Sequence, residues 1–227
     1  MKTMKKLTFA VMILALSILV GSTAVQANDK APNKLIQERI NRVLTILHDS
    51  KRGDSEQKLH EKLRKTLEPV IDFNEMTRRS LGAHGRKLTD GQIEDLTQAF
   101  KKLLEQVYIG RFTSHLSDTG PDSLKLEDIE VKGQEKKGSY ARVFSDVIFR
   151  RNNTRSNISL NYRMVNRGNG WHIYDLEIEG VSLVSNYRSQ FSNTLTNHSF
   201  EYLLNALEKK SEKAQEKPID DGTIPEI

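Results

Sequence analysis

In residues 171–191 a strand pattern passes directly into a helix pattern, which limits the folds open to this chain. In the first half, apolar and polar side chains alternate with the period of two of a β-strand. The residues expected on one face of that strand are Tyr174, Leu176 and Ile178. Gly180 ends the alternation, and Ser182 is placed to cap a helix whose apolar side chains recur from Leu183 to Phe191. No nucleophile, metal cluster or phosphate loop lies at this junction.

The same residues carry a resemblance to a known family. Their pattern, W-x-I-x-D-L-x-I-E-G-V-S-L-V-x-N-Y-R-x-Q-F, closely resembles the C-terminal signature of the MlaC family. These proteins are periplasmic phospholipid carriers, also described as toluene-tolerance proteins. Two upstream segments, residues 67–82 and 89–108, are similar to the family's helical region and its next helix, in the same order. The resemblance therefore covers most of the chain beyond its first 27 residues.

The resemblance implies a carrier that binds glycerophospholipid by its acyl chains and moves it between the membranes of a Gram-negative envelope. This transport would maintain the lipid asymmetry of the outer membrane. The implied partners are an outer-membrane lipoprotein complex and an inner-membrane ABC transporter with a substrate-binding ring component. The implied architecture is a sheet curled around a deep apolar cavity, similar to the nuclear-transport-factor-two-like folds. We expect the carrier to be a monomer, and its partners to set the direction of transport.

Residues 1–27 have the pattern of a secretory signal peptide. Three lysines precede an uncharged apolar run from Leu7 to Val20, and small residues precede the expected cleavage after Ala27. An uncleaved membrane anchor is the alternative. The apolar run is shorter than the roughly 20 residues that span a bilayer, which favours cleavage and a periplasmic location.

The order of patterns predicts an α+β fold. Helical spacing of apolar residues occupies residues 36–47, 59–67, 73–81 and 93–112, and alternating segments follow at 126–132, 140–150, 156–165 and 171–179. A last helical pattern spans residues 200–207. Asp54 with Gln57, and Thr89 with Gln92, are spaced as capping boxes at the starts of the second and fourth helical patterns. Short turns between these segments imply antiparallel neighbours. We therefore expect N-terminal helices packed on a curved antiparallel sheet. The predicted domains are a single lipid-binding domain over residues 28–208 and a disordered, charged tail over residues 209–227.

The strand at residues 140–150 carries apolar side chains on both faces, which predicts that it is covered on both sides or faces a hollow. A close-packed core is the ordinary explanation of such patterns. The resemblance favours a hollow for lipid chains. The residues that could line it are Phe73, Met76, Leu103, Leu104, Val107, Tyr108, Val143, Val147, Phe149, Ile158, Leu160, Tyr162, Tyr174, Leu176 and Ile178.

The sequence shows no recognisable catalytic or cofactor-binding motif, so we expect a non-enzyme without cofactor or metal. The chain has no cysteine, and its six histidines are scattered, which excludes thiolate metal sites and disfavours a histidine cluster. Three of its 35 lysines and arginines lie in the predicted signal peptide, so the remainder is nearly balanced against 30 acidic residues. This balance, without a basic stripe interleaved with aromatics, argues against nucleic acid as a partner.

Two alternatives remain open at this point. An isomerase-like enzyme could use the same apolar pocket, with a carboxylate base and a tyrosine donor. The candidates for these two roles are Asp146 and Asp175, and Tyr162 and Tyr174. A structural role for Asp175 is an ion pair with Arg163 or Arg188. The other alternative is an envelope adaptor with a fully packed core and no lipid.

Overall fold

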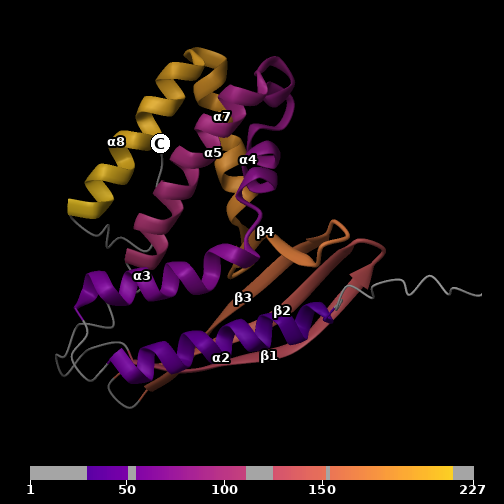
Figure 1. Ribbon diagram of the computed structural model, residues 1–227, viewed down its shortest axis with the longest axis vertical. Helices are drawn as coiled ribbons and strands as arrows, with labels where there is room; N and C mark the ends of the chain where they lie inside the picture. The colour runs from indigo at the N-terminus through magenta and orange to yellow at the C-terminus, as the bar shows by residue number, and fades with distance from the viewer. Residues whose placement is uncertain (1–29, 51–54, 111–124, 152–153, 217–227) are drawn as a thin grey trace, which may run out of the picture.

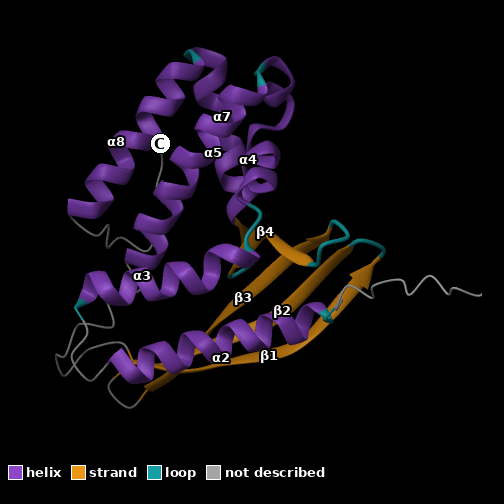
Figure 2. Cartoon of the chain, in the orientation of Figure 1, coloured by secondary structure: helices purple, strands orange, loops and turns teal. Residues whose placement is uncertain are grey.

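The computed structural model describes residues 30–50, 55–110, 125–151 and 154–216 (Figure 1). A long helix, α2, crosses one face of a single antiparallel sheet, and a bundle of four helices lies beside the β4 edge of that sheet (Figure 2). The α+β fold predicted from the order of patterns is therefore confirmed. The predicted signal peptide and residues 217–227 lie outside the described residues.

Every predicted helix and strand has a counterpart. The helices are α2 (Pro32–Ser50), α3 (Glu56–Leu67), α4 (Phe73–Leu81), α5 (Asp90–Leu104), α7 (Leu183–Asn197) and α8 (Phe200–Glu216). Short helical turns are η1 (Glu68–Val70), η2 (Gly82–Lys87) and η3 (Glu105–Ile109). The strands pair in sequence order as β1 (Lys125–Lys137), β2 (Tyr140–Arg151), β3 (Thr154–Asn166), β4 (Trp171–Ile178) and β5 (Val181–Ser182).

Side-chain caps fix where several helices begin. The predicted capping box at Thr89 and Gln92 opens α5. Ser182 caps α7 as expected, since its hydroxyl accepts a hydrogen bond from the Ser185 amide at 3.0 Å. The start of α3 differs from expectation because Ser55 is its cap, and the Ser55 hydroxyl accepts from the amide nitrogen three residues later. The residue expected as that cap, at position 54, lies outside the described residues.

The C-terminal helix is longer than predicted. The charged tail was expected from residue 209, but α8 continues to Glu216. Leu203, Leu207, Ser211 and Ala214 form one buried stripe along the helix. Ser211 and Ala214 are small side chains among charged neighbours, so the sequence shows no apolar pattern over this part of the helix. The predicted domain boundary at residue 208 therefore lies too early.

The molecule has two main apolar cores. In the bundle, the ring of Phe100 packs edge-on against Tyr187 and Phe191, with centroids 4.7 and 5.2 Å away. Under α2, Ile36 and Ile40 pack against the sheet face that we call the inner face. The bundle core fills its space with buried side chains, whereas the inner face is filled at one end only. The unfilled end of the inner face, beneath α2, contains an apolar hollow.

The opposite, outer face of the sheet carries a buried ionic cluster. Glu177 is only 5% exposed, and its carboxylate accepts hydrogen bonds from Arg142 and from Arg163, the latter at 2.9 Å. Burial raises the pKa of Glu177, but the hydrogen bond from Arg163 and the charge of Arg142 outweigh it, so the pKa lies below its ordinary value of 4.5. This carboxylate therefore stabilises the fold above about pH 4.5 and stops doing so as the pH falls through its lower folded-state pKa.

Replacing Glu177 with glutamine should lower the free energy of unfolding at neutral pH by roughly 1.5–3 kcal/mol, the contribution of hydrogen bonds to a charged group. Urea denaturation in steps from neutral to acid pH measures this. The difference between wild type and variant should shrink as the pH falls below 4.5, because the wild-type carboxylate becomes protonated. A difference that stays constant down to strongly acid pH would contradict this role.

Candidate functional site

An apolar hollow of about 330 Å³ lies between α2 and the inner face of the sheet. We call it the main hollow. Its wall comes from α2, from the end of α3 and the following turn, and from strands β1 to β4. The lining residues are Ile36, Arg39, Ile40, Val43, Leu67, Val70, Ile71, Ile129, Val147, Phe149, Ile158, Leu160, Tyr162, Ile173, Leu176 and Ile178. Its volume lies at the lower end of the ~300–1,000 Å³ range of ligand sites.

A second hollow of about 110 Å³ adjoins the first. We call it the side hollow. It lies where η1 and α4 approach β4 and the end of α5. Leu67, Ile71, Ile173 and Leu176 line both hollows, so the two lie on either side of a shared apolar wall. The other residues around the side hollow are Arg64, Glu68, Phe73, Met76, Leu104, Glu105, Tyr108, Ile109 and Leu183.

Strand alternation and helix spacing together build the main hollow. Val147 on β2 pairs with Ile158 on β3, so both side chains point to the inner face. Opposite them, Ile40 and Val43 lie on one side of α2. Ile158 and Leu160 are only half-buried, although a close-packed core would bury aliphatic side chains in mid-strand. The helix therefore covers this part of the sheet without filling the space beneath it.

Most of the residues predicted to line a hollow do border one of the two. Those residues are Phe73, Met76, Leu104, Tyr108, Val147, Phe149, Ile158, Leu160, Tyr162, Leu176 and Ile178. Three others are fully packed instead. Leu103 and Val107 belong to the bundle core, and Val143 is buried where α2 rests on the sheet. Apolar character marks all three as interior, but it does not tell a packed position from one beside a gap.

Tyr174 lies on the outer face because β4 contains an irregularity. Arg163 on β3 pairs with Asp175, but the next residue of β3 pairs with Ile173, so Tyr174 is an extra residue on β4. Its ring stacks under the guanidinium of Arg79, 4.1 Å from the ring centroid. Ile173 faces the hollow in its place. The alternation in the sequence could not reveal this bulge.

Sequence reasoning also missed the contribution of α2 to the wall. Ile36, Ile40 and Val43 stand out in the sequence as one apolar helix face, but nothing in the sequence indicates that this face borders the site. The spacing of these residues matched an ordinary amphipathic helix. A helix placed across the inner face is a property of the tertiary fold, and periodicity alone does not contain it.

Of the carboxylates and tyrosines considered as a catalytic pair, only Tyr162 borders a hollow. Burial raises the pKa of Tyr162 to about 12, partly offset by a hydrogen bond with Ser145, so its hydroxyl stays protonated. Asp146 lies 3.6 Å from the amine of Lys132 and borders neither hollow. Among the described residues, no group of three or more acidic or histidine side chains is placed to hold a metal ion.

Asp175, the other candidate base, has a structural role. Its carboxylate accepts hydrogen bonds from the Ser182 hydroxyl at 2.6 Å and from the Val184 amide at 3.0 Å, which fastens the start of α7 to β4. Arg163 lies 3.8 Å away and supplies the expected cationic partner. Arg188 instead donates to the backbone carbonyl of Arg79. Asp175 is thus fully engaged and does not border a hollow.

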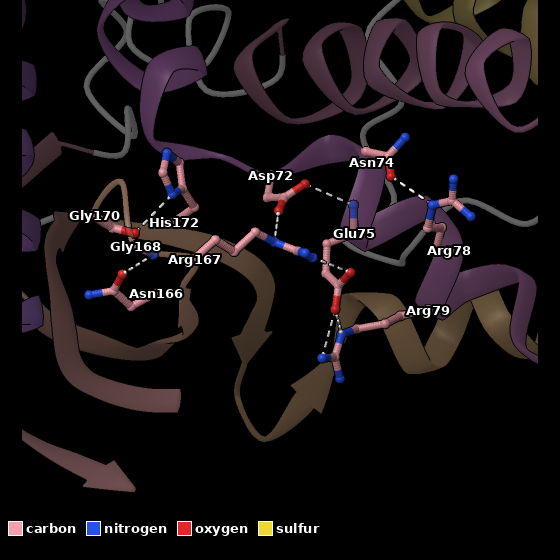
Figure 3. A network of polar contacts seen from close by, with 10 residues as sticks. All are labelled: Asp72, Asn74, Glu75, Arg78, Arg79, Asn166, Arg167, Gly168, Gly170 and His172. Atoms are coloured by element: carbon pink, nitrogen blue, oxygen red, sulfur yellow. Dashed lines mark hydrogen bonds and ion pairs between the residues drawn. The ribbon is translucent and has the colours of Figure 1, made fainter. Parts of the chain in front are cut away.

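A polar network holds the bundle against the sheet beside the two hollows (Figure 3). Arg167, in the β3–β4 turn, reaches Asp72 at 3.1 Å and Glu75 at 2.6 Å. Asp72 also caps α4, and its own amide donates to the Ile173 carbonyl at 2.8 Å. Glu75 is bonded in turn to Arg79. These contacts fix α4, which carries the side-hollow residue Met76, relative to β4.

The geometry defines a class of protein: an α+β fold in which a helix and an antiparallel sheet enclose an apolar hollow. A family model described as MlaC protein matches residues 37–209, and the chain belongs to the MlaC family. A phospholipid-binding protein from Ralstonia solanacearum, solved in complex with a phospholipid, has a similar structure with a TM-score of 0.65. The two are 23% identical, over 80% of this chain and 97% of the other. No curated protein matches this chain.

This structural likeness shows a shared fold. None of the helices in the described part of the chain has both the length and the apolar character needed to cross a membrane. The MlaC resemblance inferred from residues 171–191 is confirmed by the family match.

Proposed function

We propose that this protein binds a glycerophospholipid through its acyl chains in the main and side hollows. The observation that carries the proposal is a pair of adjoining hollows that share four apolar lining residues and whose walls are mostly aliphatic and aromatic side chains. Its family and the phospholipid bound to the Ralstonia solanacearum protein of similar fold support the same ligand. The acyl chains supply most of the affinity in this account, so the headgroup type is of minor importance.

The energy of acyl chains explains why a carrier must be hollow. At about 0.8 kcal/mol per buried methylene, two chains with some thirty methylenes represent on the order of 20–25 kcal/mol of hydrophobic free energy. Because moving a lipid from a bilayer into water costs this free energy, the lipid does not cross water unaided at a useful rate. A protein that offers equivalent apolar contact removes most of the cost, and it needs no chemical step to do so.

The proposed role is transport through the periplasm between an outer-membrane lipoprotein complex and an inner-membrane ABC transporter with its substrate-binding ring. This role would maintain the lipid asymmetry of the outer membrane. It rests on family membership and on the apolar run at residues 1–27, whose removal would release the chain into the periplasm. A protein lacking its first 27 residues in a periplasmic extract, measured by intact mass, is the expected result.

Purification from cells, followed by native mass spectrometry and solvent extraction, tests the binding function. We expect a monomer that carries two-chain lipid at near-stoichiometric yield. An empty pocket that turns over a small apolar substrate would instead support the isomerase-like enzyme. A protein that never shows bound lipid mass, even after incubation with phospholipid vesicles, would support the packed adaptor.

A further inference from the structure

Among the described residues, one charged side chain borders the main hollow. Arg39 lies on α2, in the same helix face as Ile36, Ile40 and Val43, and every other lining residue of the main hollow is uncharged. Arg39 is half-buried, so its guanidinium lies where the apolar wall meets solvent. A long cationic side chain commonly covers apolar surface with its stem and keeps its charged end at such an edge.

The guanidinium of Arg39 is incompletely satisfied. Its Nη1 donates to the carbonyl oxygen of Thr66 at 3.4 Å, a long contact, and its buried Nε has no hydrogen-bond partner within the part of the chain that the structure describes. No carboxylate of the described residues forms an ion pair with it; the adjacent Glu38 pairs with Lys30 at 2.8 Å instead. Burial and the neighbouring Arg42 lower the pKa of Arg39, which shows that its surroundings disfavour an unpaired cation.

Arg64, the arginine that borders the side hollow, does have carboxylate partners. Arg64 donates to Glu61 at 2.9 Å and to Glu68 at 2.6 Å, and Lys101 also pairs with Glu68. These charges are balanced within the protein, so an incoming anion would have to displace existing partners. Arg39 has no carboxylate partner among the described residues, so an anion that approaches its guanidinium displaces none.

We propose that Arg39 binds the phosphate group of the lipid at the edge of the main hollow. The inference rests on the proposed function and adds a polar anchor to it. A guanidinium presents a planar set of donors that matches phosphate oxygens, and partial burial strengthens the contact. Every glycerophospholipid has this phosphate, so the anchor holds the glycerol end beside α2 and directs the chains into the hollow without selecting a headgroup.

The test compares two ligands with identical acyl chains, phosphatidylglycerol and diacylglycerol, which differ in the phosphate-bearing headgroup. Binding to delipidated protein is measured by native mass spectrometry for wild type, Arg39→Gln, Arg39→Lys and Arg42→Gln. Arg42 is the matched control because it is an exposed arginine on the same helix and borders neither hollow. Wild type and the control should prefer phosphatidylglycerol about tenfold, the effect of one charge-assisted hydrogen bond.

Arg39→Gln should lose that preference while binding diacylglycerol as wild type does, which also shows that the hollow remains folded. Arg39→Lys should keep part of it. A full preference retained in Arg39→Gln, or equal binding of both lipids by wild type, would overturn the anchor and leave the carrier function intact. Wild type that binds neither lipid would refute the carrier function and the anchor with it.

Inorganic phosphate tests whether the Arg39 site binds the phosphate of a lipid or free phosphate. Added alone, it should not raise the thermal midpoint of wild type, because the lipid anchor depends on acyl chains that hold the phosphate in place. If it stabilised wild type and the Arg42→Gln control but not Arg39→Gln, the site would belong to free phosphate, and the assignment to lipid would be wrong.

Discussion

Replacing Leu160 with glutamine should weaken the binding of lipid to this protein roughly tenfold while the protein stays folded. Leu160 lies in the wall of the main hollow, opposite Ile178 on β4. A glutamine there places an amide against acyl chains that cannot bond to it, at a cost of about 1–3 kcal/mol, or roughly tenfold in affinity. In the lipid-free protein the half-buried position lets water reach the amide, so the thermal midpoint changes little. Native mass spectrometry over a range of lipid concentrations measures the affinity for lipid. Circular dichroism during heating measures the thermal midpoint.

The matched control is Leu195→Gln. Leu195 is also half-buried, but it packs against the bundle core and borders neither hollow. The same chemical change there should reduce stability and leave lipid retention per folded molecule near the wild-type value. If the bound lipid in Leu160→Gln fell only in proportion to the folded fraction, as is expected for the control, Leu160 would not be a hollow residue. Val147→Gln, on the neighbouring strand, should also weaken lipid binding, but because Val147 is buried this change should lower the thermal midpoint as well.

Phe191→Ala is expected to be the most destabilising of these substitutions. Phe191 is fully buried in the bundle, where its ring packs against Phe100 and Tyr187. Truncation of such a side chain removes its contacts and leaves a cavity, which costs about 3–5 kcal/mol. Urea denaturation of delipidated protein should show this loss, and the molecules that remain folded should still bind lipid.

The companion substitution is Ile158→Ala, in the wall of the main hollow. Its side chain already borders open space, so fewer contacts are lost on truncation and the cost should stay below about 2 kcal/mol, the low end for such changes. Both variants are measured without lipid, because bound lipid would itself stabilise the folded state. Equal costs for Phe191→Ala and Ile158→Ala would mean that the region under α2 is as tightly packed as the bundle.

The fold could be predicted because local patterns agreed with the final structure. Alternation on residues 140–150 and 156–165 matches β2 and β3, and the capping residues Thr89 and Ser182 open their helices as expected. These signals depend on neighbours within a few residues, which the sequence contains directly. The family was recognisable for a similar reason, since its signature at residues 171–191 is contiguous.

The site was only partly predictable, because hollowness depends on distances between elements. The bulge that turns Tyr174 outward follows from the pairing of β3 with β4 and leaves no mark on the alternation. The packed position of Val143 and the open one of Val147 differ only in how α2 crosses the strand. In the sequence, Arg39 resembles any arginine on a helix surface. Only the tertiary structure shows that it has no carboxylate partner among the described residues.

A crystal structure of the protein purified with its own lipid would show whether the main hollow holds acyl chains. We expect electron density for acyl chains between α2 and the inner face of the sheet, in contact with Leu160 and Ile173 and continuing toward Met76. The lipid phosphate should lie beside Arg39. Side chains that close this space entirely, or lipid bound elsewhere, would refute lipid binding in the main hollow.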